Sequence, residues 1–134
     1  MPALREHFLH TLLLSSALAI VALEASSACA QERVVTVVLT EYKFVPDRLA
    51  LQHGMRYRLR LENRGGELHE FTAPMFFKTA EIANPEVMNA DRTDVVLQPH
   101  ESKDLVLVPR QIGSYDLTCA DHDWEGMVGK ITVE

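Results

Sequence analysis

Three residues near the C-terminus have side chains that bind soft or borderline metal ions. Cys119, His122 and Met127 form a Cys-x2-His-x4-Met motif, and a fourth candidate, His69, lies about fifty residues upstream. Thiolate and thioether sulfur favour Cu(I), whereas imidazole suits Cu(II), so two imidazoles, one thiolate and one weak thioether make the donor set of a mononuclear copper electron-transfer site. The residue types therefore predict a metal centre with His69, Cys119, His122 and Met127 as ligands and copper as the cofactor.

Other interpretations of the same residues remain open. A free cysteine such as Cys119 is often a small, buried apolar residue. A Cys and His pair also suits a thiol hydrolase, but that enzyme needs an orienting third group and a substrate cleft, and the sequence marks neither. Structural zinc prefers four strong donors, and the thioether of Met127 is a poor ligand for it. A copper site in a protein that is not an enzyme uses all four residues.

The elements that must position these residues are predicted to be β-strands. From Met55 to Glu62, four apolar residues alternate with four charged ones, as in a strand with one face on a core and the other in water. Further strands are expected at residues 34–40, 94–97, 104–108, 113–119 and 127–134, between turns rich in Gly and Pro. The pattern indicates an all-β fold, an antiparallel sandwich of about seven or eight strands.

The ligand motif is expected to begin where a strand ends. Leu117 shares a strand face with Cys119, so the thiol should emerge at the end of that strand. The loop to Met127 can then fold His122 back around one ion, and Gly126 permits the bend.

One stretch breaks the strand pattern. Residues 78–90 carry helix formers interrupted by Asn84-Pro85, which predicts a short helical or loop excursion. Met75 and Met88 lie at or near this stretch, and we expect them to fill gaps in the core rather than to bind metal.

The chain resembles the cupredoxins, the plastocyanin and azurin family of type 1 blue copper proteins. The matching segments are residues 41–46, 69–71, 113–115 and 119–131, and the Cys-x2-His-x4-Met spacing is that of plastocyanin and pseudoazurin. The resemblance implies a Greek-key β-sandwich with copper near one end, held by His69, Cys119, His122 and Met127. It also implies a one-electron carrier with transient redox partner proteins. The alternative is a copper-binding protein for buffering, delivery or resistance, with copper-handling partners.

Three residues depart from the family pattern. Glu70 stands where the family usually has an Asn that ties two loops together. Asp121 stands where Pro often precedes the second ligand His, which leaves one more backbone N–H free to point at the sulfur. Trp124 lies inside the ligand loop, either as a cover for the loop or as an exposed docking residue.

Residues 1–30 have the features of a secretory signal peptide. An apolar run from Phe8 to Leu23 precedes the small residues Ala28-Cys29-Ala30, so cleavage before Gln31 and export to the periplasm are expected. A retained membrane anchor and lipidation at Cys29 are the alternatives. Cleavage leaves residues 31–134 as one cupredoxin-like domain in which Cys119 is the single cysteine.

Composition limits the remaining classes of function. The 134 residues carry a formal net charge of −6, with 47% hydrophobic and 24% charged residues, which is ordinary globular usage for one domain. A mildly acidic chain has no basic stripe for phosphates, so nucleic acid is not an expected partner. We expect a monomer without a membrane span after cleavage.

Overall fold

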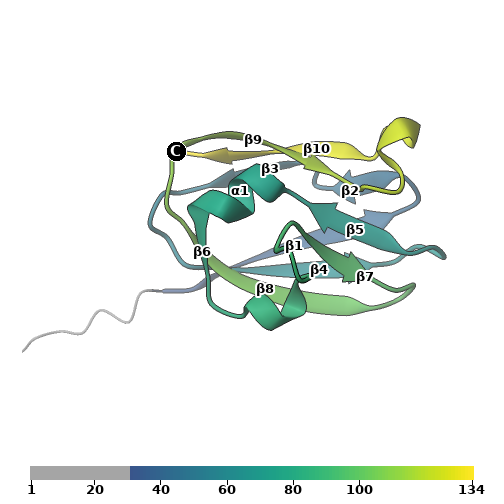
Figure 1. The fold of residues 1–134 in the computed structure, drawn as a ribbon, viewed down its shortest axis with the longest axis horizontal. Coiled ribbons are helices and arrows are strands. Elements are labelled where there is room, and N and C mark those ends of the chain that lie inside the picture. The colour runs from purple at the N-terminus through teal and green to yellow at the C-terminus, as the bar shows by residue number, and fades with distance from the viewer. Residues whose placement is uncertain (1–30) are drawn as a thin grey trace, which may run out of the picture.

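The computed structural model describes residues 31–134, which form two five-stranded sheets around a shared hydrophobic core. The first sheet has the order β2-β1-β4-β8-β6, with β1 (Arg33–Thr40), β2 (Lys43–Val45), β4 (Tyr57–Asn63), β6 (Ala80–Ile82) and β8 (Ser102–Pro109). The second has the order β3-β10-β9-β5-β7, with β3 (Arg48–Leu51), β5 (His69–Thr72), β7 (Asp94–Leu97), β9 (Gly113–Thr118) and β10 (Val128–Val133). The predicted all-β sandwich is confirmed (Figure 1), with ten strands in residues 31–134 in place of the seven or eight expected. The predicted signal peptide lies outside the described residues.

The chain crosses repeatedly between the two sheets. β3, β5 and β7 belong to the second sheet, whereas β4, β6 and β8, which follow them in turn, belong to the first. Two pairs, β1 with β4 and β3 with β10, are parallel, which the expected antiparallel sandwich did not include. Parallel neighbours arise because the chain visits the opposite sheet before it returns.

The core is built from the inward faces of alternating strands. In β4, Tyr57, Leu59 and Leu61 are buried, while Arg58 and Arg60 face outward, as the sequence pattern predicted. Phe71 of β5 is fully buried, and its neighbours in the core include the rings of Phe44 from β2 and Phe77 from α1. Alternation therefore fixes which face of each strand reaches the core.

The region between β5 and β7 carries two of the three short helices of residues 31–134. Helix α1 (Pro74–Thr79) precedes β6, and the short 3-10 helix η1 (Pro85–Val87) follows it. The excursion expected at residues 78–90 therefore begins earlier, because Pro74 starts the helix at its first turn. It lies beside β8, where the Val106 amide donates to Asn84 Oδ1 at 2.7 Å. No helix within residues 31–134 is long and apolar enough to cross a membrane.

The two methionines near this excursion have different environments. Met88 packs against the core as expected. Met75 is 63% exposed, so the prediction that it fills a core gap was wrong. The following residues of α1, Phe76 and Phe77, take the inward positions instead.

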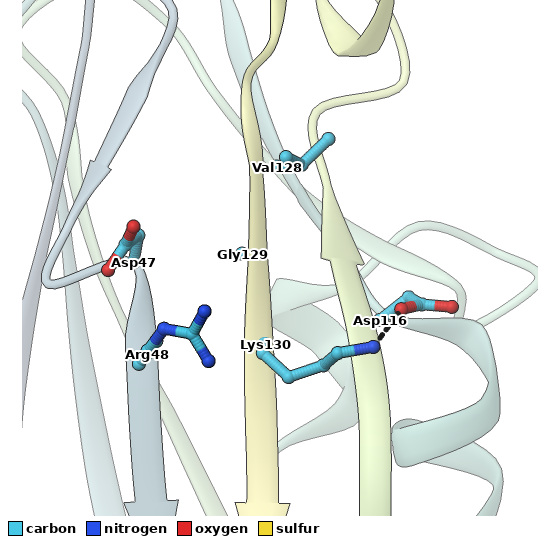
Figure 2. Close-up of a pocket in the computed structure, with 6 residues that line it drawn as sticks. All are labelled: Asp47, Arg48, Asp116, Val128, Gly129 and Lys130. Carbon is cyan, nitrogen blue, oxygen red and sulfur yellow. Dashed lines mark hydrogen bonds and ion pairs between the residues drawn. The ribbon is translucent and has the colours of Figure 1, made fainter.

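Gly129 allows β3 and β10 to approach closely. The Lys130 amide donates to the Asp47 carbonyl at 2.8 Å, and a Cβ on Gly129 would lie only 2.5 Å from that same oxygen. Figure 2 shows the shallow pocket over this glycine, with Lys130 paired to Asp116 on one side and Arg48 on the other. No predicted metal ligand lines this pocket, so it belongs to the framework of the fold.

Candidate metal centre

Two strands of the second sheet bring the predicted ligands together. β5 begins at His69, and Cys119 directly follows the last residue of β9. The two strands are antiparallel and pair through Thr72 and Thr118, so the start of β5 lies beside the residues that follow β9. The loop before β5 and the turn after β9 lie at the same end of the sandwich (Figure 1).

The loop from Cys119 to Met127 is closed by its own backbone. The Cys119 amide donates to the Met127 carbonyl at 3.0 Å, and the Met127 amide donates to the His122 carbonyl at 3.1 Å. The 3-10 helix η2 (Asp123–Glu125) forms the tip, and Gly126 ends it with a φ of 87°. The predicted role of Gly126 in the bend is confirmed, because this left-handed conformation favours glycine.

Three of the four predicted ligands have donor atoms that face one another. Cys119 Sγ lies 3.4 Å from His122 Nδ1 and 4.0 Å from His69 Nδ1, and the three donors lie within 4.8 Å of one another. His69, Cys119 and Met127 are fully buried, whereas the His122 side chain is 13% exposed. The backbone of Met127 is hydrogen-bonded to the backbone of Cys119 and His122, so the buried Met127 side chain begins beside this cluster.

The surroundings of the Cys119 sulfur shift the pKa of its thiol in opposite directions. Burial raises the pKa of the Cys119 thiol. The Glu70 amide donates to Sγ at 3.4 Å, and the amides of Glu70, Asp121 and His122 all act to lower the pKa. The contribution of Asp121 agrees with the extra N–H expected where the family often has Pro. A positive ion in the cluster is what a buried thiolate requires.

His69 is held by the loop around Gly65 that precedes β5. Burial lowers the pKa of His69, and His122 lowers it further. Its Nε2 is buried without a hydrogen-bond partner, and a Cβ on Gly65 would lie 3.0 Å from that nitrogen. The Gly65 amide donates to Asn63 Oδ1 at 2.9 Å, so Asn63 holds the loop against the ring. This geometry leaves Nδ1 as the nitrogen that faces the cluster.

Asn63 braces two segments at once. Its Nδ2 donates to the carbonyls of Glu67, at 2.7 Å, and Leu97, at 3.1 Å. Asn63 therefore ties the loop that precedes β5 to the last residue of β7. The signal available in the sequence was a polar residue at an inward position of an alternating strand, where burial without hydrogen bonds is costly.

Glu70 lies against the ligand loop. Burial raises the pKa of Glu70, and the carboxylates of Asp121 and Asp94 raise it further, whereas the amides of Asp121 and Ala120 oppose this. Its Oε2 is buried without a hydrogen-bond partner. Glu70 therefore contacts the loop at the place the family pattern assigns, through a carboxylate instead of an amide.

Glu67 meets the solvent-facing edge of His122. Glu67 Oε2 lies 3.0 Å from His122 Nε2, and the Tyr42 ring lies 5.2 Å from the His122 ring, centroid to centroid. Sequence reasoning missed both residues, because the loops that carry them meet only in the folded chain.

The contacts of His122 reopen the thiol hydrolase interpretation on one point. Cys119, His122 and Glu67 stand in the order nucleophile, base and orienting group, so the third group that the sequence did not mark is present. However, Cys119 is fully buried, and burial raises its pKa. A substrate would have no path to the sulfur, so the arrangement suits a buried ion better than a nucleophile.

Trp124 lies on the surface of the ligand loop. The indole is 78% exposed, and its Nε1 donates to the Asp121 carbonyl at 3.0 Å. Of the two expected roles, this position favours an exposed docking residue over a cover. Asp121 and Asp123 are exposed beside it, and Glu125 is partly exposed.

Residues 12–133 match the family model described as "Cupredoxin-like domain". Comparison with curated proteins gives no match. Among solved structures, the chain is similar to reduced auracyanin from Roseiflexus castenholzii, with 17% identity, 75% of this chain and 96% of that chain covered and a TM-score of 0.58. The chain is also similar to auracyanin A, a "blue" copper protein from Chloroflexus aurantiacus, with 14% identity and a TM-score of 0.57. That match covers 78% of this chain and 100% of auracyanin A. The metal-binding domain of the Cu(I)-exporting ATPase CopA from Streptococcus pneumoniae is similar with 14% identity and a TM-score of 0.51. That match covers 77% of this chain and 86% of the other.

Proposed function

Because the chain belongs to the cupredoxin-like family, we propose that it is an exported one-electron carrier with a single copper ion bound by His69, Cys119, His122 and Met127. The observation that carries this proposal is the cluster of Cys119 Sγ and two histidine Nδ1 atoms within 4.8 Å, in a buried site with an amide directed at the sulfur. A bound copper ion would supply the one-electron Cu(II)/Cu(I) couple.

The donor set fits copper better than zinc. One thiolate and two imidazoles are joined by the buried Met127, and a thioether is a ligand that copper accepts and structural zinc rarely uses. The burial of His69, Cys119 and Met127 excludes water, which keeps ligand rearrangement small when the charge changes. His122 is the least buried of the four, so its ring edge is the natural route for the electron.

The burial of Cys119 is consistent with export. An exposed thiol in an oxidising compartment would be oxidised or paired, whereas Cys119 is fully buried. We propose that residues 1–30 are removed as a signal peptide and that residues 31–134 form the working domain. Intact mass of the periplasmic protein checks this: a chain that begins near Gln31 supports it, and retention of residues 1–30 or lipid on Cys29 contradicts it.

Copper buffering or delivery is the alternative function, because the same ligands would serve it. The metal-binding domain of the copper-exporting ATPase has a similar fold and was solved with Cu(I). The two functions differ in what leaves the protein: a carrier gives up an electron and keeps the ion, whereas a delivery protein gives up the ion.

Repeated redox cycling separates the two functions. The copper-loaded protein is cycled between oxidant and reductant in the presence of an excess Cu(I) chelator. A carrier retains its copper over many cycles and exchanges electrons quickly at an electrode. Rapid transfer of copper to the chelator after the first reduction would favour delivery and contradict the proposed carrier.

A further inference from the structure

The two ring nitrogens of His122 have different partners. Nδ1 faces Cys119 Sγ at 3.4 Å, and Nε2 lies 3.0 Å from the Oε2 atom of Glu67. An ionised carboxylate accepts hydrogen bonds and donates none, and a neutral imidazole carries one N–H. The proton therefore lies on Nε2, which leaves the lone pair of Nδ1 directed at the cluster.

The backbone of Glu67 is held in place. Its carbonyl accepts the Nδ2 hydrogen of Asn63 at 2.7 Å, and the preceding Gly66 amide donates to Glu41 Oε1 at 3.2 Å. Within residues 31–134, no Lys or Arg lies within ion-pair distance of the Glu67 carboxylate. The contact with His122 is thus its one ion-pair contact in the described chain, although the Glu67 side chain is 57% exposed.

From these contacts we propose that Glu67 is a positioning residue of the metal centre, which accepts the Nε2–H of His122 and so fixes the ring with Nδ1 toward the ion. The statement about copper rests on the proposed function. A carboxylate behind a ligand imidazole makes the imidazole a stronger donor. Glu67 therefore stabilises Cu(II) relative to Cu(I) and lowers the reduction potential of the site.

The variants Glu67→Gln and Glu67→Ala test this, with Glu125→Gln as the matched control. Glu125 lies on the ligand loop, and its carboxylate makes no hydrogen bond to His122 in the described chain. The control removes the same charge near His122 and leaves the Glu67 contact in place. The hydrogen bond from Asn63 Nδ2 ends on the backbone carbonyl of residue 67, which none of the three variants removes, so the loop keeps its support.

The first measurement uses the copper-free protein. In nitrogen-15 NMR, the Nε2–H of His122 should be visible and protected from exchange with water. Its exchange should become about tenfold faster in Glu67→Ala, the effect expected for loss of one hydrogen bond to a charged group. It should stay unchanged in Glu125→Gln. Equal exchange in Glu67→Ala and the unchanged protein would overturn the proposal.

The second measurement uses the copper-loaded protein. Glu67→Gln should raise the reduction potential by more than Glu125→Gln does. Equal shifts in the two variants would mean that only net charge matters, and the positioning role would be wrong. If the unchanged protein binds no copper, the proposed function fails, while the exchange measurement still decides whether Glu67 holds the His122 ring.

Discussion

At the scale of single residues, the centre depends on which nitrogen of each histidine faces the sulfur. His69 presents Nδ1 because its Nε2 is packed against the Gly65 loop, and His122 presents Nδ1 because Glu67 holds its Nε2. The two rings are thus oriented by different means, one by packing and one by a hydrogen bond. Each can be altered without changing a ligand.

Substitution of Gly65 by Ala tests the packing on His69. The added Cβ would lie 3.0 Å from His69 Nε2 and 3.2 Å from Glu41 Oε1, so the ring or the loop has to shift. We expect copper affinity to fall, together with a loss of about 1 kcal/mol in the free energy of unfolding, the low end of the cost of overpacking. Copper titration and chemical denaturation measure the two effects. The same substitution at Gly66, where a Cβ meets nothing within 4 Å, is the control and should leave copper affinity unchanged.

The ligand candidates could be predicted from residue type and spacing, but their supports could not. Cys119, His122 and Met127 lie in one short segment, so the sequence alone predicts that they are close together. Glu67 and Asn63 act across loops whose meeting depends on the pairing of β5 with β9. That His69, Cys119, His122 and Met127 bind the ion stays a prediction, which the geometry supports.

At the scale of elements, the strands with clear alternation or β-branched runs could be predicted, including the four-residue β7 with its two valines, whereas the other strands of three or four residues could not. β2, β3, β5 and β6 have three or four residues each, too few for a period of two to be recognised. Their places are set by pairing with longer strands, as β3 pairs with β10. The parallel pairs were missed because pairing between strands far apart in the sequence leaves no local pattern.

Gly129→Ala tests how closely β3 and β10 must approach. A Cβ would lie 2.5 Å from the carbonyl oxygen of Asp47, a backbone atom directly before β3 that can move only if the backbone shifts. We expect the free energy of unfolding to fall by about 1–3 kcal/mol, as for other overpacked sites. Denaturant unfolding measures this. Gly66→Ala again serves as the control, and a loss no larger than that control's would contradict the role assigned to Gly129.

The outer face of β4 predicts a pH dependence of stability. Arg60, followed by Arg58, lowers the pKa of Asp104. A carboxyl whose folded pKa lies below its unfolded value contributes stability above the unfolded pKa and loses that contribution as pH falls through the folded pKa. Asp104→Asn should therefore reduce the free energy of unfolding at neutral pH by about 1 kcal/mol or less, since the pair is partly exposed.

Denaturation as a function of pH measures the effect of Asp104→Asn. The difference from the unchanged protein should shrink as pH falls below the ordinary Asp value of 3.8. Asp116→Asn is the matched control, because the Asp116 side chain is 82% exposed in its pair with Lys130. A difference that grows on acidification would contradict the assigned sign.

At the scale of the whole molecule, acidic groups surround the exposed edge of His122. Glu125, followed by Glu67, raises the pKa of the Tyr42 hydroxyl, which reports the negative field at this end. Asp121 and Asp123 add exposed carboxylates beside Trp124. Such a field should attract a positively charged partner and weaken with added salt.

Neutralising part of this acidic surface tests its role in docking. The triple variant Asp121→Asn, Asp123→Asn and Glu125→Gln should slow electron transfer to a basic partner at low salt and flatten the salt dependence of the rate. Stopped-flow kinetics over a range of ionic strength provides the measurement, and the visible absorption should be largely retained. Loss of copper with unchanged salt dependence would show instead that these residues support the metal.

Every role proposed for this site requires Cys119 to be the sulfur donor of a copper centre. The most direct test is the visible absorption spectrum after Cu(II) is added to the copper-free protein and to Cys119→Ser. The unchanged protein should develop an intense band from charge transfer between the thiolate and copper, and Cys119→Ser should remain folded without it. A band that persists in Cys119→Ser, or its absence from the folded, unchanged protein, would contradict a copper centre with Cys119 as a ligand.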